Sequence, residues 1–309
     1  MKIGLVGVGR WGKNIANTLL RFEEIELCCV TSSNPNIYNF VPDGCRVYKE
    51  WQNMLNHPNL DGIIVSTPPD THYEIAKSSL IKEIPVLVEK PLTLNEKEAL
   101  SLKKISTKNN TLLMTEFTQV FNPKFKALKN SLNLIGVIKK IYTEAYNFGP
   151  IRRDTPVLWD WGSHELSILI SLLNQTPKFI KATKINQKIN NIGDASTWEI
   201  ICNFKNQITS VSKISNIYKK KRKISVIGSK GIITLDDLSV YPLKFYKGQH
   251  LSSLENEKGN LIYIENQKKP LDEALLNFFN CIRNQEINHW SLDLGVEVTQ
   301  LLEKCSKDF

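Results

Sequence analysis

Three glycines near the start of the sequence have the spacing of a phosphate-binding loop. Gly7, Gly9 and Gly12 form the pattern G-x-G-x-x-G, after an apolar run and before a segment with helical periodicity. The first glycine permits a tight turn, the second lets the backbone approach a pyrophosphate, and the third lets the following helix pack closely. The amino end of that helix adds N–H groups and positive potential. The pattern predicts a dinucleotide site that includes the intervening Arg10 and Trp11.

The end of the next strand-like run bears on which dinucleotide binds. An NAD site usually carries Asp or Glu about 20 residues beyond the glycine loop, because a carboxylate binds the ribose hydroxyls and repels a 2′-phosphate. Here the run ends in Thr31, Ser32 and Ser33, with no carboxylate. These hydroxyls can donate to a phosphate, and Arg10 could reach the same region. The sequence therefore favours NADP over NAD, while NAD stays open because another loop can supply the missing acid.

A lysine directly after another apolar strand could act on a substrate hydroxyl. Lys90 follows Val86–Glu89, and ligands of open parallel sheets bind beyond the carboxyl ends of the strands. Oxidation of an alcohol by hydride loss requires a base near the hydroxyl, and a positive charge there stabilises an alkoxide. The alternative is an ordinary surface lysine at a strand end.

An acid and a histidine four residues apart form the second candidate pair. On a helix, Asp160 and His164 share one face, as two groups that converge on one hydroxyl would need. A histidine near its ordinary pKa exchanges a proton at neutral pH. The competing interpretation is structural, with Asp160 as a helix cap and His164 in the core.

The elements that must position these residues alternate over the first part of the chain. Apolar strand-like runs lie at Lys2–Val6, Leu27–Thr31, Gly62–Thr67, Val86–Glu89 and Leu112–Phe117. Segments with helical periodicity lie between them, at Trp11–Leu20, Thr71–Ile81 and Asn95–Ser106. This succession predicts a doubly wound parallel sheet, the Rossmann type of α/β domain, over residues 1–118.

The rhythm changes near residue 120. One helix is predicted at Trp159–Leu173, and strand then follows strand directly, at Phe179–Gln187, Thr197–Phe204, Ile208–Ile214, Ile224–Ile227, Gly231–Leu235, Leu243–Tyr246 and Leu261–Ile264. Helical patterns return at Leu271–Arg283 and Ser291–Cys305. We therefore expect residues 119–309 to form an α+β domain with a large, open, mostly antiparallel sheet.

Three further segments carry a family resemblance. STPPDTH at Ser66–His72, EKP at Glu89–Pro91 and WDWGSHELSIL from Trp159, behind the glycine loop, resemble the Gfo/Idh/MocA family of NAD(P)-dependent oxidoreductases, closest to members that act on nucleotide sugars or belong to surface-polysaccharide clusters. The resemblance implies a Rossmann domain followed by a substrate-binding sheet that often oligomerises. It implies His164 as general base and Asp160 as the group that orients substrate or supports the histidine. Glu165 stands where relatives often carry Asp.

The resemblance also extends to residues with weaker signals. Around the nicotinamide it implies Thr67, Pro68, His72, Glu89 and Lys90, although a proline pair is also an ordinary loop and His72 could simply begin a helix. Substrate contacts are expected at Asn122, Arg152, Arg153 and Trp161. For these four the plain alternatives are a turn at Asn-Pro, solvated arginines and a packed tryptophan.

Composition sets the wider limits. The chain has 309 residues, of which 41% are hydrophobic, so it can bury a large core without disulfides. Six cysteines are scattered without a C-x-x-C pair, and we expect reduced thiols and no metal. His57, His250 and His289 show no partner. Neither a transmembrane run nor a signal peptide is evident, which predicts a cytoplasmic protein away from membranes.

The formal charge of +9 favours anionic ligands, but its pattern does not favour nucleic acid. The dense basic run Lys219–Lys223 lacks interleaved aromatic residues and is typical of a solvated surface. We therefore expect a homodimeric or homotetrameric oxidoreductase that moves hydride between NAD(P) and a hydroxyl or keto group of a sugar, polyol or nucleotide sugar. Alternatives are a non-redox reaction with transient oxidation by retained NAD, and a cofactor-binding sensor without turnover.

Overall fold

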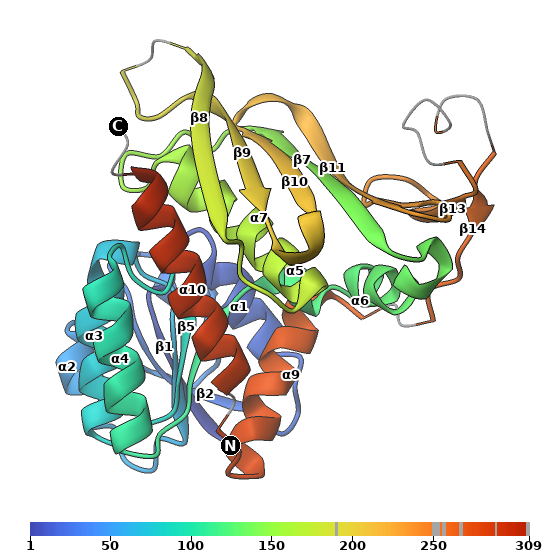
Figure 1. Ribbon diagram of the computed structural model, residues 1–309. Coiled ribbons are helices and arrows are strands. Elements are labelled where there is room, and N and C mark those ends of the chain that lie inside the picture. Colours follow the sequence, from blue (N-terminus) through green and yellow to red (C-terminus); the bar gives the residue numbers. More distant parts are fainter. Residues whose placement is uncertain (189–190, 249–253, 255–257, 266–267, 288, 307–309) are drawn as a thin grey trace. The chain divides into compact units, whose positions relative to one another are not determined.

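The computed structural model describes residues 1–188, 191–248, 254, 258–265, 268–287 and 289–306 (Figure 1). The chain divides into two compact units. The first unit consists of Met1–Phe117 and Leu271–Glu303, and the second of Thr118–Pro270 and Lys304–Phe309. The sequence predicts a continuous second domain over 119–309, whereas the grouping by contacts assigns Leu271–Glu303 to the first unit. The helices near the carboxyl end belong to the first unit because they bury apolar side chains, Leu292 and Val296 among them, in its core.

The first unit contains a sheet of six parallel strands, as the alternating pattern predicts. The strand order is β3-β2-β1-β4-β5-β6. Their bounds are β1 Lys2–Val6, β2 Glu26–Thr31, β3 Arg46–Tyr48, β4 Gly62–Val65, β5 Val86–Glu89 and β6 Leu113–Glu116. The order reverses at β1, and in such sheets the cofactor binds beyond the carboxyl ends of the strands at that point. The Rossmann expectation is confirmed.

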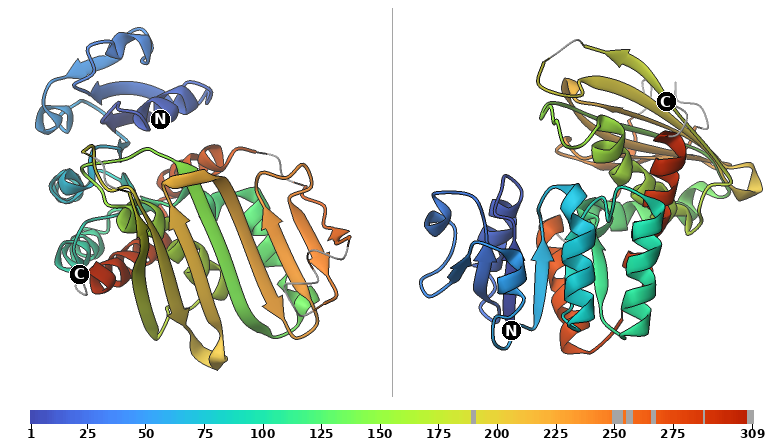
Figure 2. Two further views of the ribbon diagram at one scale, coloured as in Figure 1. Left: turned by 90° about the horizontal axis from the view of Figure 1, so that it is seen from above. Right: turned by 90° about the vertical axis from the view of Figure 1, so that its left-hand side faces the viewer.

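Helices cover both faces of this sheet (Figure 1, Figure 2). They are α1 Gly12–Leu19, α2 Trp51–Met54, α3 His72–Ile81, α4 Glu96–Lys108, α9 Pro270–Arg283 and α10 His289–Ser306. One core joins side chains of α2, α3, α4 and α10 to the strands, with Ile75, Leu102 and Val296 among its members. On the other face, Phe278 of α9 lies against Gly62 and Phe279 packs edge-on to Phe22.

The second unit contains an eight-stranded sheet in the order β14-β13-β12-β11-β7-β10-β9-β8. Its strands are β7 Ile138–Phe148, β8 Phe179–Gln187, β9 Ser196–Asn203, β10 Thr209–Ser215, β11 Ile217–Gly228, β12 Ile232–Asp236, β13 Leu243–Tyr246 and β14 Asn260–Leu261. The β7–β10 pair is parallel and the other pairs are antiparallel, so the expected mostly antiparallel sheet is confirmed. Among its described residues, this unit also contains the α-helices α5 Thr118–Phe121, α6 Pro123–Asn130 and α7 Val157–Leu173.

Some elements are not evident in the sequence. Strand β7 and the first half of β11 carry several charged residues, so neither shows a continuous apolar run. Strand β11 begins at Ile217 and includes the basic run Lys219–Lys223, which therefore lies on a strand of the second sheet. Strand β3 and helix α2 are too short to show a period. His250 lies outside the described residues. Within the described part of the chain, no helix is both long and apolar enough to span a membrane.

Candidate functional site

The loop between β1 and α1 has the close packing that its three glycines permit. Gly7 has a φ of +93°, and a Cβ there would lie 2.9 Å from the carbonyl oxygen of Ser66. A Cβ on Gly12 would lie 2.1 Å from the carbonyl oxygen of Gly7, so α1 can begin this close to β1 only at a glycine. Around a Cβ on Gly9 there is no atom within 4 Å. The loop therefore fits a pyrophosphate that approaches the backbone at Gly9.

The end of β2 is held against the same loop. The Gly7 amide donates to the carbonyl oxygen of Thr31 over 2.8 Å. The Thr31 hydroxyl lies 3.3 Å from the sulfur of Met54, and the Ser32 hydroxyl accepts from the Asn34 amide. Thr31 thus turns its side chain toward α2, whereas Ser33 is exposed. Arg10, in the glycine loop, is exposed as well.

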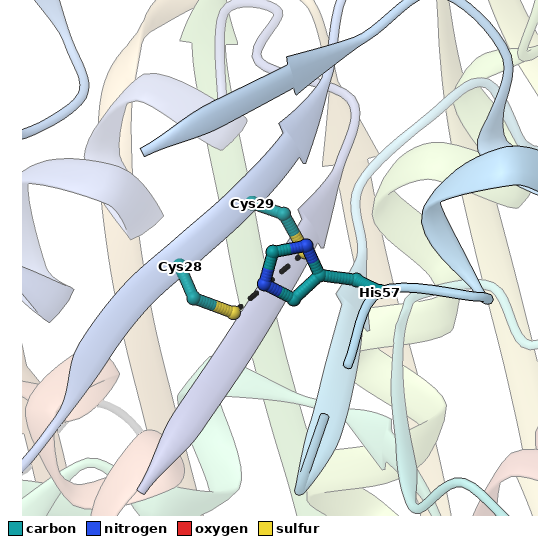
Figure 3. A group of neighbouring side chains, drawn as sticks. All are labelled: Cys28, Cys29 and His57. Carbon is teal, nitrogen blue, oxygen red and sulfur yellow. Dashed lines mark hydrogen bonds between the residues drawn. The ribbon is translucent and has the colours of Figure 1, made fainter. Parts of the chain in front are cut away.

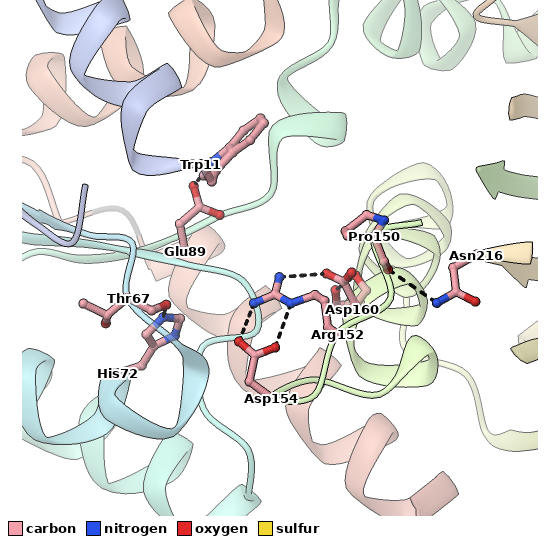
Figure 4. Close-up of polar contacts among 10 residues, drawn as sticks. Trp11, Thr67, His72, Glu89, Pro150, Arg152, Asp154, Asp160 and Asn216 are labelled. Atoms are coloured by element: carbon pink, nitrogen blue, oxygen red, sulfur yellow. Dashed lines mark hydrogen bonds and ion pairs between the residues drawn. The ribbon is translucent and has the colours of Figure 1, made fainter. Parts of the chain in front are cut away.

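Trp11 connects the glycine loop to the end of β5. Its indole Nε1 donates to Glu89 Oε1 over 2.5 Å (Figure 4). Glu89 is 8% exposed, and its register partner on β6 is Glu116, which is 1% exposed. Burial raises the pKa of Glu89 well above its ordinary value, and the adjacent Glu116 raises it further, against the opposing effects of Lys90 and Trp11. The sequence predicts a cofactor contact at Glu89, and the structure places this carboxyl group beside Glu116, where it accepts from Trp11.

His72, where the sequence predicts a cofactor contact, lies at the start of α3. The side chain is fully buried, with Nδ1 2.9 Å from the carbonyl oxygen of Pro91 and Nε2 3.0 Å from that of Thr67 (Figure 4). Burial lowers its pKa, although both carbonyls act in the opposite direction. Both ring nitrogens of His72 are thus within hydrogen-bond distance of backbone carbonyl oxygens. Its imidazole joins the segment after β4 to the segment after β5.

Lys90 follows β5 directly and is half-buried. The residues on both sides of Lys90 make fixed contacts. Glu89 accepts a hydrogen bond from Trp11, and the Pro91 carbonyl oxygen lies within hydrogen-bond distance of His72. The preceding loop is also ordered, because the Thr71 hydroxyl donates to Thr67 Oγ1 over 2.6 Å and lies 2.7 Å from the Pro68 carbonyl oxygen. Thr67 is half-buried and Pro68 is exposed. The backbone that carries Lys90 is therefore held on both sides.

In the second unit, α7 carries Asp160 and His164 one turn apart. The helix begins after Pro156, and its first amide, at Val157, donates 2.8 Å to Asp194 Oδ2. Because Asp194 supplies the cap from another segment, the interpretation of Asp160 as the helix cap is wrong. Asp160 keeps a side chain that is 15% exposed, and its Oδ1 lies 3.7 Å from Arg152 Nη1. His164 is half-buried, with its Nδ1 buried.

The two arginines before α7 have different surroundings. Arg152 makes a two-point ion pair with Asp154, at 2.9 Å and 2.8 Å, in addition to its contact with Asp160 (Figure 4). Arg153 is exposed and donates 2.9 Å to the carbonyl oxygen of Ile192. Arg152 is therefore part of the polar group around Asp160, while Arg153 braces the neighbouring loop.

A pocket opens beside α7 within the second unit. Its lining includes Gln119, Asn122, Glu165, Arg222, Lys223 and Asp237. Asn122 is 6% exposed and caps α6, with its side-chain oxygen accepting from the Lys124 amide over 3.0 Å. Burial raises the pKa of Glu165, against the positive charge of Arg222. The Arg222 guanidinium lies 4.7 Å from the centre of the Trp161 ring, and Trp161 is 7% exposed.

The sequence does not point to three residues that lie near the proposed site residues: Asp194, Arg222 and Glu116. Asp194 follows a glycine in a loop and has no motif around it. Arg222 lies within the basic run, for which the sequence predicts a solvated surface. In the structure this residue lies on β11, and its guanidinium contacts the Trp161 ring. Glu116 could have been found, because it ends an apolar strand as Glu89 does, and adjacent parallel strands place such ends side by side.

Comparisons with known proteins agree across the chain. Residues 1–117 match the family model described as the oxidoreductase family, NAD-binding Rossmann fold, and residues 151–309 match its C-terminal alpha/beta domain. A solved protein of Magnetospirillum magnetotacticum, classed as an oxidoreductase, is 31% identical with a TM-score of 0.93 and 99% of each chain covered. Myo-inositol 2-dehydrogenase of Thermotoga maritima is 24% identical over 77% of this chain and 76% of its own length.

A further solved structure shares the fold at lower identity. A 3-ketoreductase from Actinomadura kijaniata, in complex with NADP and TDP-benzene, has a TM-score of 0.85 at 15% identity, with 99% of this chain and 97% of that chain covered.

Proposed function

The chain belongs to the Gfo/Idh/MocA oxidoreductase family, and from this premise we propose that it transfers hydride between NAD(P) and a hydroxyl or keto group of a sugar, polyol or nucleotide sugar. The observation that carries the proposal is on α7, where Asp160 and His164 lie one turn apart on one helix face while Asp194 caps that helix. Because the cap is supplied by another segment, neither residue is needed to begin the helix. The names of similar proteins support the substrate class, since they include a myo-inositol dehydrogenase and a 3-ketoreductase.

The first unit supplies the cofactor site. We assign the pyrophosphate to the backbone of Gly7, Gly9 and Gly12, where the absence of neighbours around Gly9 leaves room for it. Ser32, Ser33 and Arg10 are proposed ligands of a 2′-phosphate, in line with a preference for NADP. When bound, the nicotinamide ring accepts or provides the hydride. Thr67 and Pro68 form the loop proposed to lie beside that ring.

Lys90 is proposed to act on the substrate oxygen. Its ammonium group donates to the hydroxyl or carbonyl oxygen and stabilises negative charge on that oxygen as hydride moves. The buried contacts on either side of Lys90, from Glu89 to Trp11 and from Pro91 to His72, hold its backbone in one position. Such fixed positioning is what makes an electrostatic contribution effective in catalysis.

His164 is proposed to exchange the hydroxyl proton. Because its Nδ1 is buried, we assign the exchange to Nε2. Asp160 is proposed to orient the substrate or the imidazole, and the Arg152 contact at 3.7 Å helps to hold its carboxylate in place. Arg152, Arg153, Asn122 and Trp161 are the remaining proposed substrate residues, of which Asn122 lies at the pocket beside α7.

The proposal also includes assembly of the protein through the sheet of the second unit. Large apolar side chains are exposed on strands of this sheet, with Phe148 at 64%, Phe179 at 48% and Ile185 at 49%. Burying such residues favours association. We propose a cytoplasmic homodimer or homotetramer formed through this face, and sedimentation of the purified protein as a monomer would exclude it.

Nicotinamide absorbance tests the proposal. Both cofactors, in both oxidation states, are offered to free sugars, polyols and nucleotide sugars, with Lys90→Met as the test variant and Lys104→Met as the matched control, because Lys104 is an exposed lysine on α4. We expect turnover with at least one substrate class, lost in Lys90→Met and kept in Lys104→Met. Cofactor binding without turnover across the whole panel would contradict the proposal and favour a sensor.

A further inference from the structure

Two adjacent cysteines on β2 present their thiols on the same side of the strand. In a regular strand, consecutive side chains point to opposite faces. Here Ile3 pairs with Leu27 and Gly4 pairs with Cys29, so Cys28 is an extra residue in a bulge of β2. The two sulfur atoms lie 3.7 Å apart (Figure 3). In a regular strand these two thiols would lie on opposite faces of the sheet. The bulge instead brings them together as a vicinal dithiol.

An imidazole lies over this dithiol. His57 comes from the segment after α2, and its ligand atom and the two sulfur atoms all lie within 4.8 Å of one another (Figure 3). The His57 Nδ1 lies 3.0 Å from the hydroxyl of Tyr48, on the adjacent strand β3. Metal-binding histidines usually have one ring nitrogen held in this way by a neighbouring polar group while the other nitrogen binds the ion. Tyr48 therefore orients the ring so that Nε2 is available to a ligand.

The three donor side chains offer soft ligand atoms and are largely buried from solvent. Cys28 is 4% exposed and Cys29 is fully buried, among apolar side chains that include Met54, whereas His57 is half-buried at the edge of the group. Two sulfur atoms and one imidazole nitrogen, with no carboxylate among them, suit thiophilic cations and not Mg²⁺ or Ca²⁺. With metal–sulfur bonds of about 2.3 Å, sulfurs 3.7 Å apart subtend an angle of about 107° at the ion, close to tetrahedral.

We propose that Cys28, Cys29 and His57 form a binding site for a thiophilic d¹⁰ cation of the Zn²⁺ type. On binding, each thiol gives its proton to the buffer as a sulfur–metal bond forms, and the Nε2 lone pair of His57 supplies the third bond. A water molecule completes the four positions. The site lies within the first unit, and it does not rest on the proposed hydride transfer. It joins β2 to the segment after α2, so an ion there stabilises this side of the first unit.

The test uses the reduced, full-length protein with Cd²⁺ as the probe, because thiolate-to-cadmium charge transfer gives an ultraviolet band. We expect about one tightly bound Cd²⁺ per chain, displaced by Zn²⁺, with a raised Tm. Cys28→Ser and His57→Gln remove a ligand and should abolish stoichiometric binding, while Cys202→Ser, a buried cysteine of the second unit, should leave it unchanged. Tyr48→Phe keeps all three ligands and should weaken binding by about tenfold.

Three results would overturn the proposal. They are the absence of a charge-transfer band in the parent protein, an unchanged band in Cys28→Ser, and equal affinities in the parent, His57→Gln and Tyr48→Phe proteins. Because His57 and Tyr48 are only half-buried, we expect their variants to fold, so a failure of Cys28→Ser to fold still leaves two informative variants. Hydride transfer measured with and without chelator separates the two proposals, since loss of the cation site leaves the dehydrogenase assay intact.

Discussion

The indole of Trp11 donates to the buried carboxyl group of Glu89, which ties the glycine loop to the end of β5, directly before Lys90. Two parts of the proposed site that are distant in sequence are thus joined by one hydrogen bond within the first unit. The loop's position is therefore coupled to that of the proposed catalytic lysine.

Removing the indole donor should weaken cofactor binding more than it slows the reaction. Trp11→Phe leaves Glu89 without this partner, at a cost of about 1–2 kcal/mol, which corresponds to roughly a 5- to 30-fold rise in cofactor Kd. Glu89→Gln keeps a carbonyl oxygen that can accept from the indole and should change Kd far less. Fluorescence titration of both variants checks this, and equal effects would refute the coupling.

The buried Glu89 should make stability fall as pH rises. Its pKa is raised by burial and by Glu116, so the folded state holds a proton that the unfolded state loses above the ordinary value of 4.5. The stabilisation is complete below that value and declines toward the raised pKa, by at most about 1.4 kcal/mol per pH unit for one proton. Urea unfolding between about pH 5 and 8 should show this slope. Glu89→Gln should flatten it, and an unchanged slope would contradict the assignment.

Replacing His164 should affect the chemical step. His164→Asn removes the proposed proton acceptor and should lower kcat by about 10²- to 10⁴-fold, with little change in the KM for cofactor. His289→Asn is the matched control, because His289 is exposed at the start of α10. Steady-state hydride transfer checks both, and near-normal kcat in His164→Asn would exclude the residue from the mechanism.

Asp194 should stabilise α7 without acting on substrate. Asp194→Ala removes the side-chain acceptor of the Val157 amide and should cost about 0.5–2 kcal/mol in the free energy of unfolding. Asp194→Asn, which keeps an acceptor oxygen, should recover most of that loss. Denaturant unfolding measures the difference, and equal stabilities of the alanine variant and the parent would argue against the cap.

Residue patterns predict much of this fold for physical reasons. Apolar parallel strands such as Val86–Glu89 are buried on both faces, so their sequence is a continuous run with clear ends. Strands exposed to polar surroundings, such as β7 and the lysine-rich start of β11, lack that signal. The helices of Leu271–Glu303 are recognisable by period, but their membership of the first unit depends on packing partners far away in sequence.

The sequence predicts which residues form the candidate site, but it does not predict most of the contacts that they make. The glycine spacing specifies backbone geometry directly, because only glycine can occupy positions such as Gly12. The contacts of Glu89 with Trp11 and of His72 with Pro91 could not be predicted, because they depend on residues that are distant in sequence. The sequence does not predict that the thiols of Cys28 and Cys29 lie on one side of β2, because this arrangement arises from a bulge that has no local sequence pattern.

The most direct test of the central claim follows the hydride itself. NADPH labelled with deuterium at the transferring position of the nicotinamide is incubated with a keto sugar or keto nucleotide sugar, and the product is analysed by mass spectrometry and NMR. We expect one deuterium at the reduced ring carbon with the parent protein and with Lys104→Met, and none with Lys90→Met. Product that forms without deuterium, or labelled product at an undiminished rate with Lys90→Met, would contradict the central claim.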